Sequence, residues 1–183
     1  PGAMPKIPYI EGIKSDDNLF TLRNIADTDR IKNYVDINKP QKALVIGGGF
    51  IGLEMVENLQ KRGVEVTLVH SRNQVMKPVD YEMASILHNH LIEKGVKLIL
   101  EDKPAKIENK GRKVTLLSSK EIETDMIILS IGVTPESKIA KDAGLEVNSK
   151  GAIVVNSKMR TSDENIYAVG DAVQVIDFVN KKP

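Results

Sequence analysis

The sequence predicts an α/β fold in which parallel strands alternate with helices, and three observations lead to it. An apolar run at 43–46 is followed by a glycine-rich turn at 47–52 and then by an amphipathic stretch. A second apolar run at 64–69 lies within about thirty residues of the first, as a βαβ unit requires. Another helical pattern and several short alternating strands come after it. The order is that of a Rossmann-like βαβαβ unit with an antiparallel β-meander and a returning strand.

The N-terminal part is expected to lead into this unit. Residues 1–13 are irregular and rich in proline, which removes backbone donors and breaks regular structure. A short strand is predicted over 19–22. A helix is then predicted to begin near Asp27 or Thr28, because either side chain can cap its first turn. Pro40 separates this helix from the first strand of the βαβ unit.

Two helix and strand pairs complete the parallel sheet. The helix after the glycines, over about 51–62, is expected to end at Gly63, a usual left-handed cap. Asp80 can cap the next helix, which ends at Gly95 before a third strand at 96–100. The apolar positions that define the spacing of this helix are Met83, Ile86, Leu87 and Leu91.

The remaining elements are short strands. Alternating runs separated by polar turns predict the meander at 106–108, 112–117 and 121–123. The continuous apolar run 126–130 suits a strand that is covered on both faces. Two last strands are predicted at 153–155 and 166–169.

Composition excludes several classes of function. The 183 residues suffice for one domain with pieces of another, and the net charge of +1 gives no nucleic-acid footprint. No apolar stretch approaches the roughly 20 residues of a membrane span, and no leader pattern is present, so a cytoplasmic protein without membrane contact is expected. The absence of cysteine excludes disulfides, thiolate metal sites and a thiol nucleophile on this chain.

The glycine-rich turn is the strongest functional signal. Gly47 allows the tight turn after the strand, Gly49 leaves the backbone open to a pyrophosphate, and Gly52 lets the helix pack closely. The helix N-terminus adds free N–H donors and a positive dipole end. The motif therefore predicts a dinucleotide site; the alternative is a glycine-rich turn without a ligand.

The residues that follow the second strand bear on the choice between NADH and NADPH. A carboxylate there would accept from the ribose 2′-hydroxyl and repel a 2′-phosphate, but the sequence has His70, Ser71 and Arg72. Arg72 offers a charged fork, Ser71 a hydroxyl, and His70 an imidazole that can donate or stack on adenine. This set predicts NADPH with NADH tolerated; the alternative is a polar loop with no preference.

No metal site is predicted. His88 and His90 stand two positions apart on one helix, so they point to different faces and are expected to be solvated. The methionines are expected to fill the core, at Met76, Met83 and Met126.

With these motifs in place, the chain resembles the pyridine nucleotide-disulfide oxidoreductases, which bind two dinucleotides. Three further blocks support the resemblance: the stretch 1–12, the segment Ile131–Glu136, and the segment Thr161–Ala172. They resemble the exit from the flavin domain, the return crossing and the second flavin-binding block. Local runs at 20–24 with 27–29, and at 73–76 with 78–83, resemble the branch of coenzyme A-disulfide and persulfide reductases.

The resemblance implies three parts of a larger protein. Residues 1–18 would be the exit segment of the FAD domain, 19–133 the NAD(P)-binding domain, and 134–183 the return segment. The family's redox cysteine, first flavin fingerprint and dimerisation domain have no counterpart here. We therefore expect the chain by itself to bind nucleotide without turnover, and the full-length enzyme to be a homodimer.

The resemblance also assigns further site residues. Phe50 resembles the gate residue that lies between nicotinamide and flavin. The alternative is that Phe50 is an apolar residue at the start of the helix that packs on the sheet. Glu54 resembles a carboxylate that pairs with a flavin-side lysine or orients the carboxamide, and its alternative is a solvated glutamate that favours the helix dipole. Ile51 joins the cofactor-binding set, and Gly132 lets the backbone approach the nicotinamide or merely forms a turn. Asp171 would cap a helix and bond the flavin ribityl chain.

The expected function follows from these roles. The chain would be the NAD(P)H-binding part of a FAD-dependent reductase that passes hydride from nicotinamide to flavin, toward a small-molecule disulfide or persulfide. Two alternatives stay open: the NADH oxidase, peroxidase or nitrite reductase branch, and a non-catalytic nucleotide-binding module.

Overall fold

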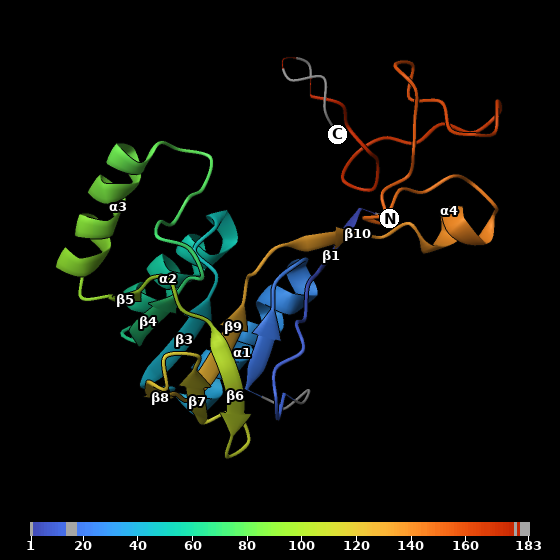
Figure 1. Ribbon diagram of the computed structural model, residues 1–183. Coiled ribbons are helices and arrows are strands. Elements are labelled where there is room, and N and C mark those ends of the chain that lie inside the picture. The colour runs from blue at the N-terminus through green and yellow to red at the C-terminus, as the bar shows by residue number, and fades with distance from the viewer. Residues whose placement is uncertain (1, 14–17, 178, 180–183) are drawn as a thin grey trace. The chain divides into compact units, whose positions relative to one another are not determined.

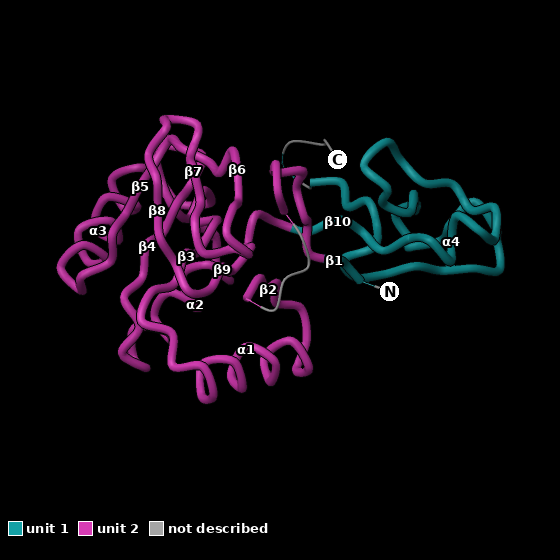
Figure 2. Tube along the Cα trace, turned by 90° about the horizontal axis from the view of Figure 1, so that it is seen from below, with its two compact units in different colours: residues 1–4, 133–183 teal, residues 5–132 magenta. Residues whose placement is uncertain are grey.

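The computed structural model describes residues 2–13, 18–177 and 179, and it divides into two compact units. The larger unit spans 5–132, and the smaller one combines 1–4 with 133–183 (Figure 2). Parts of the predicted flavin-domain segments lie outside the described residues, namely Pro1, residues 14–17, residue 178 and residues 180–183.

A five-stranded parallel sheet forms the centre of the larger unit, in the order β2-β9-β3-β4-β5 (Figure 1). Ile46 at the end of β3 pairs with Val69 of β4 and with Leu129 of β9, so the carboxyl ends of these strands meet at one edge. The predicted βαβαβ order and the returning strand are confirmed. The strands are β2 (Leu19–Thr21), β3 (Lys42–Ile46), β4 (Glu65–Val69), β5 (Lys97–Ile99) and β9 (Met126–Leu129).

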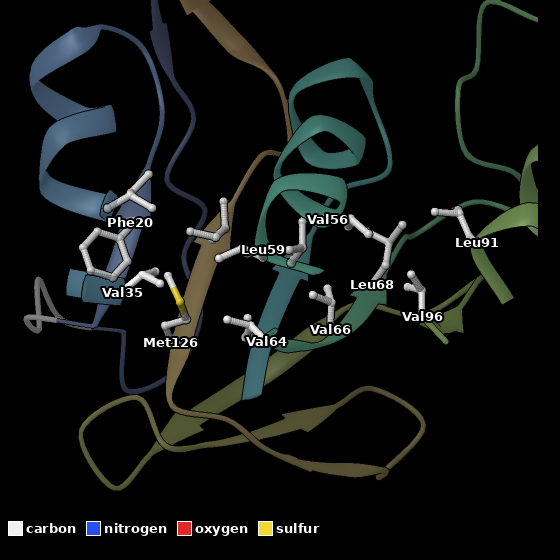
Figure 3. Close-up of a cluster of buried hydrophobic side chains, with 14 of the residues drawn as sticks. Phe20, Val35, Val56, Leu59, Val64, Val66, Leu68, Leu91, Val96 and Met126 are labelled. Atoms are coloured by element: carbon white, nitrogen blue, oxygen red, sulfur yellow. The ribbon is translucent and has the colours of Figure 1, made fainter. Parts of the chain in front are cut away.

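One face of the sheet carries the helices α1 (Ile25–Asn38), α2 (Phe50–Lys61) and α3 (Tyr81–Glu93). Strand residues point alternately to the two faces, and Val45 and Ile128 belong to the cluster on the helical side. Figure 3 shows the side chains of this cluster, from the strands and from all three helices, meeting in one apolar layer. This layer fixes α2 against the strands on either side of the glycine-rich turn.

The opposite face is covered by the antiparallel meander β6 (Pro104–Glu108), β7 (Lys113–Leu116) and β8 (Glu121–Glu123). Leu44 and Ile127 pack here against the meander's apolar side chains, and Ile10 of the N-terminal stretch joins them. Because both faces are covered, β3 and β9 are apolar along nearly their whole length, as the sequence predicted for 126–130.

We expect Leu44→Ala to lower the free energy of unfolding by about 2–5 kcal/mol, because Leu44 is fully buried in a central strand. Denaturant unfolding followed by circular dichroism measures the change. The matched control is Leu117→Ala, whose leucine is 60% exposed and should change stability by less than about 0.5 kcal/mol. Equal losses in the two variants would contradict this account of the core.

Two sequence predictions about the helices are wrong. α1 begins at Ile25, not near Asp27 or Thr28, because the Asn24 side chain accepts from the Asp27 N–H while the Asp27 carboxylate accepts from the Asn24 N–H. α3 buries Ala84, His88 and Leu91, whereas the predicted core positions Met83 and Ile86 are exposed.

The smaller unit has little regular structure among its described residues. It contains most of the strand β1 (Ala3–Pro5), which pairs with β10 (Val133–Pro135). The short helix α4 (Lys138–Asp142) and a small apolar cluster around Ile153 complete it. The strands predicted at 153–155 and 166–169 are wrong, because Ile153 and Tyr167 form isolated bridges instead.

Candidate nucleotide-binding site

The turn from β3 into α2 is held tightly at its first residue, Gly47. The Gly47 N–H donates to the Val69 carbonyl at 2.8 Å, and the Ser130 hydroxyl donates to the Gly47 carbonyl at 2.9 Å. Gly47 has a φ of +113°, and a Cβ there would lie 2.4 Å from the Ser130 carbonyl oxygen. Only glycine fits this position without a shift of the backbone.

The next part of the turn is open. Gly49 is exposed, and a Cβ built on it would meet no atom within 4 Å. No side chain caps the start of α2, and the first backbone bond of the helix runs from the Leu53 N–H to the Gly49 carbonyl. The N–H groups of the first helical turn are therefore free to bind an anion.

Gly52 lies on the inner side of α2, where the helix passes closest to the turn. A Cβ on Gly52 would come within 1.9 Å of the Gly47 carbonyl oxygen and 2.7 Å of the Ser130 hydroxyl oxygen. The close approach that the sequence predicted for this glycine is therefore present.

His70 has a structural contact that the sequence did not predict. Its Nδ1 accepts from the Gly48 N–H at 3.1 Å, and its Nε2 is buried. Burial lowers the pKa of His70, and the charge of Arg72 lowers it further. The imidazole ring thus stabilises the glycine turn through its hydrogen bond with Gly48. The role of His70 as a donor to a ligand stays a prediction.

The loop after β4 folds back onto the same turn. The Met76 N–H donates to the Gly48 carbonyl at 2.8 Å, and Val75 is fully buried. His88 of α3 accepts from the Val75 N–H at 3.2 Å, so the prediction that His88 is solvated is wrong, while His90 is exposed as expected. The loop and the glycine turn therefore brace each other.

These contacts predict a loss of stability in acid. Burial lowers the pKa of His70 and of His88 in the folded protein, so the unfolded chain binds protons first as the pH falls below the ordinary histidine value of about 6.5. The free energy of unfolding should therefore fall from about pH 6.5 downward, until the lowered pKa values are passed. Urea unfolding between about pH 7.5 and 5 measures this decline.

The variant His70→Asn separates the contribution of His70, since an amide oxygen can accept from Gly48 but does not titrate. We expect it to decline less steeply with acid than the wild type does. His90→Asn, at an exposed position, should keep the wild-type slope. Identical slopes in all three proteins would show that His70 does not couple folding to pH.

Ser71 and Arg72 are exposed just after β4, and the backbone of Glu101, an acidic residue that the sequence analysis did not connect with them, lies next to Arg72. The Glu101 N–H donates to the Arg72 carbonyl at 3.0 Å, which brings the end of β5 next to these residues. Residues 70–79, which follow β4 along the chain, include no acidic side chain. The signal that could have found Glu101 is its place directly after a parallel strand, since strand ends share one edge.

Phe50, Ile51 and Glu54 lie on the exposed side of the first turns of α2. Phe50 is 62% exposed, which excludes the alternative that it packs on the sheet. Phe50 and Glu54 line an open groove of about 820 Å³ between α2 and α3, whose lining also includes Leu53, Met76 and Leu87.

The other two predicted residues lie away from the turn in sequence. Gly132 ends the larger unit with a φ of +110°, and its carbonyl accepts from the Lys6 N–H at 2.9 Å. Asp171 is an exposed turn residue of the smaller unit. The helix expected after Asp171 is absent from the described residues, so the predicted N-cap is wrong.

Neither a metal site nor a membrane-spanning helix is found in the part of the chain that the structure describes. No three histidine or acidic side chains there are grouped as a metal ion requires. Nor is any described helix both long and apolar enough to cross a membrane.

Comparison with known proteins decides the family. The sequence profile named "Pyridine nucleotide-disulphide oxidoreductase" matches residues 1–181. The chain belongs to the pyridine nucleotide-disulphide oxidoreductase family. This family membership was predicted from the glycine turn and the flavin-type blocks, and it is confirmed.

Several relatives of this chain have been named or solved. A reduced CoADR-RHD from Bacillus anthracis is 56% identical with a TM-score of 0.96, over 100% of this chain and 33% of that one. A NAD-dependent persulfide reductase from A. fulgidus is 38% identical with a TM-score of 0.92, over 99% and 34%. An NADH oxidase from Methanocaldococcus jannaschii is 42% identical, over 97% of this chain and 40% of that protein. The chain thus spans less than half the length of these relatives.

A pair of further structures differs in the nucleotide bound. The water-forming NADH oxidase from Lactobacillus brevis, bound to NADH, is 28% identical with a TM-score of 0.86, over 96% of this chain and 38% of that one. Its engineered NADPH oxidase variant, bound to NADPH, is 28% identical with a TM-score of 0.85, over the same shares of both chains. Oxidoreductases of this fold therefore include both NADH and NADPH complexes.

Proposed function

We propose that this chain is the NAD(P)H-binding part of a FAD-dependent disulfide reductase of the coenzyme A-disulfide or persulfide reductase type. The observation that carries the proposal is the glycine turn, closed at Gly47 and Gly52 but open at Gly49, where free N–H groups begin α2. A pyrophosphate is the ligand that such a turn accommodates best. The choice of branch is supported by the persulfide reductase from A. fulgidus. It is also supported by a coenzyme A disulfide reductase from Staphylococcus haemolyticus, which is 37% identical over 86% of this chain and 35% of that protein.

The chain's own residues would act mainly by position and charge. The N–H groups from Gly49 onward would hold the pyrophosphate, and His70 and Ser130 would keep the turn in shape. Phe50, exposed on the first turn of α2, would gate the nicotinamide, with Glu54 one turn later orienting its carboxamide. The bound nucleotide would supply a hydride, which FAD in the complete enzyme takes up. Gly132 would let the backbone approach the nicotinamide, and Asp171 would bond the ribityl chain of the flavin in the complete enzyme.

We further propose that the site prefers NADPH and tolerates NADH. In the engineered NADPH oxidase, the substitutions remove an aspartate and introduce two arginines and a serine. The spacing of the substituted positions is that of Gly52, His70, Ser71, Arg72 and Lys77 here. This chain has no carboxylate at these positions and has a hydroxyl and two cations, which suit a 2′-phosphate.

Two other functions are supported less well. The 42% identity to an NADH oxidase keeps the oxidase branch as an alternative for the whole protein. A non-catalytic nucleotide-binding module would use the same turn without a flavin. The disulfide substrate, the homodimer and the cytoplasmic location are proposals about the full-length protein.

Calorimetric titration of the chain with NADPH and with NADH tests the proposal. We expect both to bind at a single site, NADPH more tightly. Gly49→Val should weaken both by about tenfold or more, because its side chain would occupy the pyrophosphate position, while the thermal unfolding midpoint stays unchanged. Equal affinity of Gly49→Val and wild type would place the nucleotide elsewhere and refute the proposal.

A further inference from the structure

Glu101 occupies a defined place beside the segment that is proposed to select the nucleotide. The His70 N–H donates to the Ile99 carbonyl at 2.8 Å, and the Glu101 N–H donates to the Arg72 carbonyl at 3.0 Å. The Asp102 N–H completes the ladder by donating to the His70 carbonyl at 3.2 Å. Residues 70–72 and 99–102 therefore run side by side at the carboxyl edge of the sheet.

Of the two carboxylates in this ladder, one is already engaged. Asp102 is buried, and it accepts from the Lys103 N–H at 2.8 Å and from the Ser118 hydroxyl. Glu101 is exposed, and its carboxylate takes part in no hydrogen bond or ion pair among the described residues. Its backbone holds a left-handed φ of 57°, an uncommon conformation for a residue other than glycine, asparagine or aspartate.

We propose that Glu101 is a specificity-determining residue that favours NADH and opposes the preference of Arg72 for NADPH; the inference rests on the proposed nucleotide-binding function. A carboxylate at this edge can accept from the ribose 2′-hydroxyl of NADH. The same charge repels the 2′-phosphate of NADPH, which carries about −1.5 to −2 charges near pH 7. In such sites the acidic residue usually stands at the end of the second strand, which is β4 here. In this chain the acidic residue is Glu101, which follows the neighbouring strand β5.

The opposed charges explain why one site would accept both nucleotides. Arg72 attracts the 2′-phosphate of NADPH, and the charge of Glu101 reduces that attraction. Only Glu101 accepts a hydrogen bond from the 2′-hydroxyl of NADH. Because the Glu101 side chain is exposed, water and salt screen its charge, and Glu101 is expected to change the affinity for either nucleotide by a modest factor.

Glu101→Gln tests the inference, since the amide keeps the size of the side chain and removes its charge. We expect NADPH to bind roughly threefold more tightly and NADH roughly threefold more weakly, with the NADPH effect shrinking at high salt. The matched control is Glu123→Gln, which makes the same charge change at an exposed residue of β8. Glu123 lies three residues before β9 begins, and therefore near the amino ends of the parallel strands, away from the glycine turn. It should leave the ratio of the two affinities unchanged.

The outcomes separate this inference from the proposed function. If the wild type binds both nucleotides and Glu101→Gln leaves their affinity ratio unchanged, the role of Glu101 is refuted and the nucleotide site stands. An equal shift of that ratio in Glu123→Gln would also refute it, because the effect would then be one of net charge. If the folded wild type binds neither nucleotide, the proposed function fails and the inference fails with it.

Discussion

The variant Gly47→Ala is expected to lose about 3 kcal/mol or more of its free energy of unfolding. An alanine at a φ of +113° is strained, and its Cβ would lie 2.4 Å from the Ser130 carbonyl oxygen and 2.7 Å from the adjoining carbon. Both atoms are backbone, so the end of β9 would have to move away from β3. Denaturant unfolding of the purified variant measures the loss.

Gly49→Ala is the matched control for this prediction. Gly49 has a φ of −87°, which any residue adopts, and nothing lies within 4 Å of its Cβ position. We expect its free energy of unfolding to stay within about 0.5 kcal/mol of the wild-type value. If both variants were equally stable, the close contact between the turn and the end of β9 would be wrong.

Replacement of Arg72 by alanine is expected to weaken NADPH binding by roughly 10- to 100-fold, since hydrogen bonds to a charged group contribute about 1.5–3 kcal/mol. NADH lacks the 2′-phosphate and should lose little affinity. The backbone contact between Arg72 and Glu101 involves only main-chain atoms, so the loop should keep its shape. Calorimetry with the two nucleotides gives both changes in the same protein.

Lys120→Ala serves as the charge-matched control, because Lys120 lies in an exposed turn of the meander. It should leave both affinities near the wild-type values. A loss in Arg72→Ala that is equal for NADPH and NADH would contradict the assignment of Arg72 to the 2′-phosphate.

Much of the larger unit could be predicted from the sequence, because its strands are apolar runs and its turns contain glycine at fixed places. The buried strand 126–130 and the glycine turn are clear examples. The predicted start of α1 was too late because Asp27 or Thr28 was expected to cap the helix, whereas Asn24 is the N-cap and the Asp27 carboxylate accepts from the Asn24 N–H. The buried face of α3 was misplaced because His88 takes a core position by accepting from a loop N–H, which helical spacing cannot reveal.

The sequence predicted the candidate site best where neighbouring residues form one motif. Gly47, Gly49 and Gly52 follow one another, and their geometry agrees with the roles inferred for them. Glu101 and Ser130 come from other strands, and only the pairing of the sheet brings them to the same edge. In the smaller unit, the short apolar runs at 153–155 and 166–169 predict strands, but Ile153 and Tyr167 form only isolated bridges.

The central claim is that the open glycine turn holds the pyrophosphate of the nucleotide. Titration of the isotopically labelled chain with NADPH, followed through its backbone amide resonances, tests this claim most directly. We predict that the largest shifts fall on the amides from Gly49 to Gly52, whose N–H groups begin α2. Saturable NADPH binding with these amides unchanged, and the largest shifts elsewhere, would contradict it.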